Sequence, residues 1–159
     1  MLAVFVSLAM ILSVVENLIP IPIAVPGVKL GLANIITVLV ILKFGPKEAF
    51  VVVFLRCLLV SMLFGGPIIF LFSVTGGLLS TLVMVLLYKY FGKVFSILGI
   101  SVAGSIAHNI GQITIACIIL NEFLIVTYLP VLLVTGIITG VFVGILSGFV
   151  NDALKKIKI

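Results

Sequence analysis

The feature that most constrains the fold of this chain is a single arginine inside a long apolar run. Arg56 is the only charged residue between positions 49 and 64. A run of that length makes most of a membrane crossing, and an arginine near the centre of a bilayer costs roughly 2.5–3.5 kcal/mol. The chain must therefore fold so that Arg56 faces a partner, a water-filled cavity or a ligand.

The composition points to the same environment. Only 8% of the 159 residues are charged and 64% are hydrophobic, whereas a soluble domain carries about 25% charged residues. A soluble protein of this kind would have too few polar side chains to cover its surface. We therefore predict an all-α integral membrane bundle, with residues 1–159 in a single transmembrane domain in contact with the lipid bilayer.

Six apolar segments, separated by glycine, proline or polar residues, predict six transmembrane helices. They cover about 2–19, 30–42, 49–64, 67–88, 94–120 and 127–150. The second segment spans only about 20 Å, against a hydrocarbon core of about 30 Å. Residues 20–29 before it are apolar but rich in proline, so they predict a re-entrant loop. Because irregular backbone at membrane depth must be covered by protein or line a cavity, this loop indicates a pocket.

The lysines lie in alternate connections of the predicted bundle. The loops after 30–42 and after 67–88 carry two lysines each, and the tail carries three, whereas Lys29 is the only lysine on the opposite side. The net charge of +5 is thus explained by membrane topology and does not indicate binding to nucleic acid. By the positive-inside rule we expect a multi-pass protein of the cell membrane with both termini in the cytoplasm.

With this topology, the strongly polar residues of the crossings fall in the middle or outer half of the bundle. Ser101, Ser105, His108 and Gln112 share one face of their helix. The predicted substrate-binding residues are Glu16, Asn17, Lys29, Asn34, Arg56, Ser105, His108, Asn109 and Gln112. Intramembrane polar groups mark ligand sites or pathways by default. The alternative is structural, with Glu16 paired to Lys29 or to Arg56.

These residue types favour binding over catalysis. Asp152 is the only aspartate, and the sequence has no pair of acidic clusters, no metal-ligand spacing and no phosphate-binding GxxxxGK[ST] loop. We therefore expect no enzyme, no metal and no cofactor. Two cations, a carboxylate, an imidazole and several amides suit a small polar or anionic molecule held by Arg56, with Lys29 as a second candidate.

Small residues mark two helix faces. Gly136, Gly140, Gly144 and Gly148 recur at every fourth position and allow another helix to approach closely. Packing within the bundle is the favoured interpretation, and docking of a partner protein is the alternative. Ala3 and Ser7 form a weaker pair of the same kind on the first helix.

Several strings resemble a known family. ENLIP at 16–20, PGVKLGLAN at 26–34 and HNIGQ at 108–112 resemble the Gx transporter family, also labelled heptaprenyl diphosphate synthase component I. That family is similar to the substrate-binding S components of energy-coupling factor (ECF) vitamin transporters. The resemblance implies a six-helix subunit whose outer-half pocket is capped by 20–29 as a gate loop. It also implies that this pocket is lined or bordered by Glu16, Lys29, Asn34, Arg56, His108, Asn109 and Gln112.

S components dock on a transmembrane coupling protein with ATPases through an AxxxA-type motif on the first helix. Here the nearest match is Ala3-x-x-x-Ser7, which departs from the motif at its second small residue. Three hypotheses follow: a substrate-binding subunit of a small-molecule uptake transporter, a non-catalytic membrane subunit or scaffold linked to isoprenoid or quinone biosynthesis, and an autonomous transporter packed as an oligomer through the 136–148 glycines.

Overall fold

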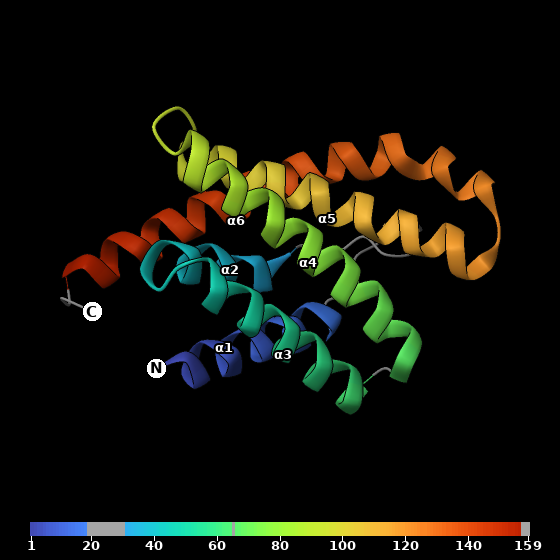
Figure 1. The fold of residues 1–159 in the computed structure, drawn as a ribbon, viewed down its shortest axis with the longest axis horizontal. Helices are drawn as coiled ribbons and strands as arrows, with labels where there is room; N and C mark the ends of the chain where they lie inside the picture. Colours follow the sequence, from blue (N-terminus) through green and yellow to red (C-terminus); the bar gives the residue numbers. More distant parts are fainter. Residues whose placement is uncertain (19–30, 65, 157–159) are drawn as a thin grey trace.

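The structure, a computed structural model, describes residues 1–18, 31–64 and 66–156 (Figure 1). All regular structure in these ranges is helical, which confirms the predicted all-α bundle of six helices. The helices are α1 Leu2–Leu18, α2 Leu32–Lys43, α3 Pro46–Phe64, α4 Gly66–Phe91, α5 Ile97–Leu120 and α6 Leu129–Lys156, with a 3₁₀ helix, η1, over Phe123–Tyr128. The predicted re-entrant loop 20–29 lies outside the described residues.

The helices are those of a membrane protein. Within the described residues, three stretches are long and apolar enough to cross a bilayer: Gly66–Phe91, Ile97–Leu120 and the combined Phe123–Lys156. Helices α1 and α2 are apolar but shorter. Large apolar side chains such as Met62, Val94 and Phe123 are exposed on the surface, where lipid rather than water would cover them.

Three helices have bounds that differ from the predicted ones, and residues at their ends explain the differences. Helix α6 extends to Lys156, because the positive charges of Lys155 and Lys156 in its last turn interact favourably with the negative end of the helix dipole and stabilise that turn. Helix α3 begins earlier than predicted, at Pro46, a residue that is favoured in a first turn. Helix α5 begins later, after Ser96, whose hydroxyl accepts a hydrogen bond from the Gly99 amide at 3.3 Å.

Helix α2 occupies the centre of the bundle. All nine residues of its segment 33–41 are buried, and α2 contacts α1, α3, α4, α5 and α6. The long helices α4, α5 and α6 pack in that order on one side of it, and α1 and α3 lie on the other side (Figure 1). With twelve residues, α2 is only about 18 Å long, so its N-terminus is placed inside the bundle.

The two ends of the bundle differ in charge. Figure 1 shows the N-terminus, the α2–α3 and α4–α5 connections and the C-terminal end of α6 at one end. The end of α3, the start of α4 and the α5–η1 connection lie at the other. The first end carries Lys43, Lys47, Lys89, Lys93, Lys155 and Lys156, and we refer to it as the lysine end. Its location in the cytoplasm remains a prediction from the positive-inside rule.

The glycines of α6 close the contact with α5. A Cβ atom on Gly140 would lie 2.6 Å from the Val102 Cα, and one on Gly144 would lie 2.8 Å from the Leu98 Cα. A Cβ on Gly136 would lie 2.8 Å from the Asn109 Nδ2. These three glycines therefore serve packing within the chain, whereas a Cβ on Gly148 would meet nothing within 4 Å. Ala3 and Ser7 lie on the exposed face of α1, where the Ser7 hydroxyl donates to the Ala3 carbonyl at 3.0 Å.

We expect Gly140→Ala to lower the free energy of unfolding by about 1–3 kcal/mol, because the new methyl group meets backbone and α5 must move away from α6. Gly148→Ala is the matched control on the same helix, and should be neutral or slightly stabilising because alanine is the better helix former. Thermal unfolding of both variants in detergent micelles measures the difference. Equal stability of the two variants would show that the α5–α6 contact is looser than described.

Candidate functional site

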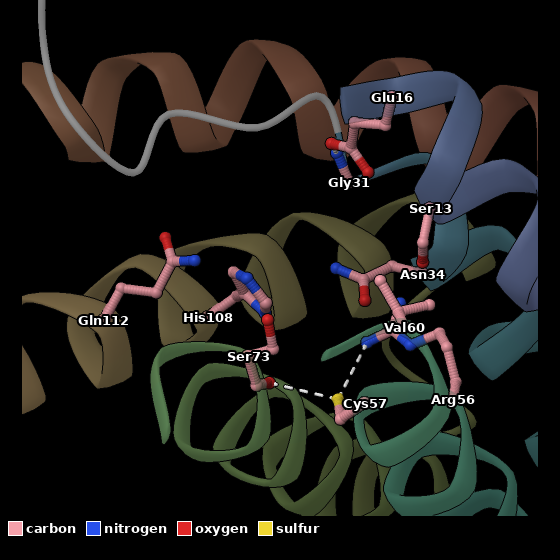
Figure 2. Close-up of a pocket in the computed structure, with 10 residues that line it drawn as sticks. All are labelled: Ser13, Glu16, Gly31, Asn34, Arg56, Cys57, Val60, Ser73, His108 and Gln112. Carbon is pink, nitrogen blue, oxygen red and sulfur yellow. Dashed lines mark hydrogen bonds between the residues drawn. The ribbon is translucent and has the colours of Figure 1, made fainter. Parts of the chain in front are cut away.

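A cavity, drawn in Figure 2, is lined by residues in the parts of the helices that lie away from the lysine end. Its volume is about 40 Å³, and it opens to the outside on one side. Its lining comes from five helices: the C-terminal part of α1, the start of α2, the second halves of α3 and α5, and the first part of α4. The lining residues are Ser13, Glu16, Gly31, Asn34, Arg56, Cys57, Val60, Ser73, His108 and Gln112.

The structure brings together five of the predicted substrate-binding residues, namely Glu16, Asn34, Arg56, His108 and Gln112. Two others on α5 are buried but point elsewhere. The Asn109 amide donates to the Leu132 carbonyl of α6 at 2.6 Å, and the Ser105 hydroxyl lies 3.2 Å from where a Gly140 Cβ would be. Lys29 and the Asn17 side chain lie outside the described part of the chain.

Arg56 is a buried cation on the wall of this site. Its side chain is 7% exposed, and its Nη2 donates to the Cys57 sulfur at 3.8 Å, a weak bond. The Cys57 thiol in turn donates to the Ser73 carbonyl at 3.3 Å and so ties α3 to α4 (Figure 2). Among the described residues, no carboxylate lies within ion-pair distance of the guanidinium, since the ion pair found there joins Lys155 and Asp152. Burial of a charge without such a partner is unfavourable.

Glu16 lies across the cavity from Arg56. Its carboxylate accepts a hydrogen bond from the Gly31 amide, and Gly31 adopts a left-handed φ of 72° directly before α2. A carboxylate at a helix N-terminus is stabilised by the helix dipole. Figure 2 shows the Ser13 and Asn34 side chains between Glu16 and Arg56. The described geometry therefore gives Glu16 a role at the start of α2, without the ion pair to Arg56 that was one alternative.

Two adjacent glycines of α4, which the sequence analysis did not single out, form a wall of the site. A Cβ on Gly77 would lie 2.9 Å from the Val53 Cγ1 and 3.3 Å from the Arg56 Nη2. A Cβ on Gly76 would lie 3.0 Å from the His108 Cε1 and 3.1 Å from the Gln112 Cγ. The α4 backbone thus passes between the arginine of α3 and the polar pair of α5.

The sequence does carry a signal for this wall, which is the pair of adjacent glycines inside an apolar helical segment. Each glycine costs about 0.5–1 kcal/mol of stability in a helix, so such a pair indicates a place where another segment packs closely against the helix backbone. Two further lining residues could have been found from their positions in the sequence. Cys57 directly follows Arg56, and Ser13 lies about one helical turn before Glu16, so each is close to a predicted site residue.

The site combines one guanidinium, one carboxylate, an imidazole, two amides and two serine residues from five helices. Such a set can orient a small polar molecule through several directional hydrogen bonds, and the guanidinium can hold an anionic group. In the described part of the chain, no group of three histidine, cysteine or acidic residues is arranged to hold a metal ion.

A protein-family model described as heptaprenyl diphosphate synthase component I matches residues 5–150. The match covers all the residues that line the cavity and at least part of every helix. No curated protein and no solved structure matches the chain.

We expect Arg56→Met to leave the free energy of unfolding of the ligand-free protein unchanged or to raise it by about 1–3 kcal/mol. Methionine fills a similar volume and removes the burial of a charge. Thermal unfolding in detergent micelles tests this, with Cys57→Ala as the neighbouring control, which removes the weak bonds of a thiol and one small buried side chain without changing the charge. A fall in Tm of more than about 4 °C for Arg56→Met alone would assign the arginine to holding the fold.

Proposed function

The chain belongs to the heptaprenyl diphosphate synthase component I family, and we propose that it is a substrate-binding membrane subunit, similar to an S component, of a small-molecule uptake transporter. The observation that carries this proposal is the buried Arg56 guanidinium on the wall of a polar cavity. A ligand with an anionic group would supply the countercharge that the described part of the chain does not place beside Arg56. Arginine suits this role because its planar fork of N–H donors matches carboxylate and phosphate oxygens.

The position of the cavity supports capture from outside the cell. The cavity lies away from the lysine end, and the positive-inside rule assigns lysine-bearing connections to the cytoplasm. Towards the lysine end the bundle is filled by an apolar core that includes Leu39, Val40, Met84 and Val143. A ligand bound beside Arg56 would reach the cytoplasm only after these helices rearrange or the subunit reorients.

Such a rearrangement needs energy from a partner. The sequence has no phosphate-binding loop of its own, so an ECF-type transmembrane coupling protein with ATPases is the proposed source. Ala3 and Ser7 on the exposed face of α1 are the candidate contact for that partner. This assignment rests on the resemblance to S components and is open to a direct co-purification test.

The description of the family favours a second candidate, a non-catalytic membrane subunit of a complex linked to isoprenoid or quinone biosynthesis. A non-catalytic role fits the sequence, whose single aspartate, Asp152, lies near the C-terminal end of α6. Affinity purification from the native membrane separates the two candidates. ATPase subunits in the eluate support the transporter, whereas a soluble prenyl synthase without ATPases supports the second candidate.

A thermal-shift screen tests the proposed ligand site. The probes are small carboxylates and phosphates added to the purified protein in detergent. At a concentration of about 100 Kd, a bound ligand adds about 2.7 kcal/mol of stability, which is a rise in Tm of roughly 5–10 °C. We expect this rise in the wild type and in Lys93→Ala, an exposed cation at the lysine end, and its loss in Arg56→Ala. If every probe that stabilises the wild type stabilises Arg56→Ala equally, the cavity is not an anion site.

A further inference from the structure

Gln112 is a second polar group of the cavity whose hydrogen bonding the described chain does not complete. The side chain is 5% exposed and lines the cavity, and its Oε1 atom is buried with no hydrogen-bond donor among the described residues. A buried acceptor without a donor carries its full desolvation penalty, so such atoms in proteins are nearly always satisfied by some partner.

Three threonines of these helices find partners within their own helix, whereas the buried hydroxyls of Ser80, Ser101, Ser105 and Ser147 share with Gln112 the lack of a partner among the described residues. The hydroxyls of Thr37, Thr81 and Thr114 each donate to the main-chain carbonyl one turn earlier, which is the usual local solution in a helix. The Gln112 side chain instead extends away from the α5 ribbon (Figure 2). A donor that enters the cavity and reaches this amide would supply the hydrogen bond that its oxygen lacks among the described residues.

The α4 backbone sets the distance between Gln112 and Arg56. The Arg56 Nη2 lies 3.3 Å from the Cβ position of Gly77, and the Gln112 Cγ lies 3.1 Å from the Cβ position of Gly76. Adding the spacing of about 3.8 Å between consecutive Cα atoms and two Cα–Cβ bonds of about 1.5 Å, the Arg56 Nη2 and the Gln112 Cγ are separated by at most roughly 13 Å. One small molecule can contact both.

We propose that the ligand of this cavity carries two recognition groups: an anionic group held by Arg56, and an uncharged N–H or O–H donor accepted by the Gln112 side-chain oxygen. The inference rests on the proposed function and adds the substrate class, an acid with a hydrogen-bond donor at a defined distance from its charge. A site built around a buried acceptor strongly rejects analogues that lack the matching donor, because the acceptor is then left without a partner.

A series of N-acetyl amino acids measures which distance between the charge and the hydrogen-bond donor the cavity prefers. The N-acetyl derivatives of glycine, β-alanine, 4-aminobutyrate and 6-aminohexanoate present the same amide N–H at increasing distance from one carboxylate. Each is compared with its N-methyl analogue, which lacks the donor, and with its methyl ester, which lacks the charge. Dissociation constants come from saturation-transfer NMR titrations with the wild type, Gln112→Leu, Arg56→Gln, and Thr114→Leu as a control on the exposed face of α5.

We expect one chain length to bind the wild type best, and its N-methyl analogue to bind about tenfold more weakly or worse. This preference should vanish in Gln112→Leu and persist in Thr114→Leu. In Arg56→Gln, the acid should lose its advantage over the methyl ester while the N–H compound remains preferred over its N-methyl analogue.

Equal binding of the N–H and N-methyl compounds to the wild type at every chain length would overturn the inference while leaving Arg56 as the anion site. If Gln112→Leu still prefers the N–H compound over its N-methyl analogue, the inference about Gln112 is likewise overturned. If no acid binds the wild type more tightly than its ester, the proposed function fails, and the inference fails with it. The comparison in the wild type decides the question even if Gln112→Leu does not fold.

Discussion

The structure depends on one constraint, which is the burial of the Arg56 charge inside an apolar bundle. Several neighbouring features make room for this side chain. The lack of a side chain on Gly77 lets α4 pack closely here, since a Cβ atom at that position would lie 3.3 Å from the Arg56 Nη2. The Cys57 sulfur accepts one weak bond from the guanidinium, and the short helix α2 begins at the cavity, so that its N-terminal residues help to line it. A guanidinium in a solid apolar core would be prohibitively unfavourable, whereas one on the wall of a polar cavity can be compensated by a ligand.

The bundle is asymmetric along its axis in both packing and charge. On the lysine side, buried aliphatic residues of α2, α4 and α6 form a continuous core, and glycines of α6 bring its backbone against that of α5. On the other side, polar side chains from five helices surround a cavity. In the proposed function, the cavity would hold a ligand near one membrane face while the apolar core blocks its passage to the other. The close packing of α6 on α5 also explains three of the four α6 glycines without the need for a partner protein.

The fold could be predicted from the sequence because apolar runs and their breakers define helices in a membrane directly. The site could be predicted only in part. Residues 105, 108, 109 and 112 all lie within one broad face of α5, but a helix turns by about 100° per residue. His108 and Gln112 lean towards the cavity, while Ser105 and Asn109 lean towards α6. Periodicity identifies such a face but not which neighbouring helix each residue meets, and it carries no sign of the Gly76–Gly77 wall, whose role depends on packing between α3, α4 and α5.

The most direct test of the central claim is an experimental structure of the protein purified gently from its native membrane, at a resolution that shows bound small molecules. The account predicts density for a molecule in the cavity, with an anionic group at hydrogen-bond distance, about 2.7–3.2 Å, from the Arg56 guanidinium. An empty cavity in which Arg56 forms an ion pair with a carboxylate of its own chain would contradict it, and would assign the arginine to the architecture of the bundle.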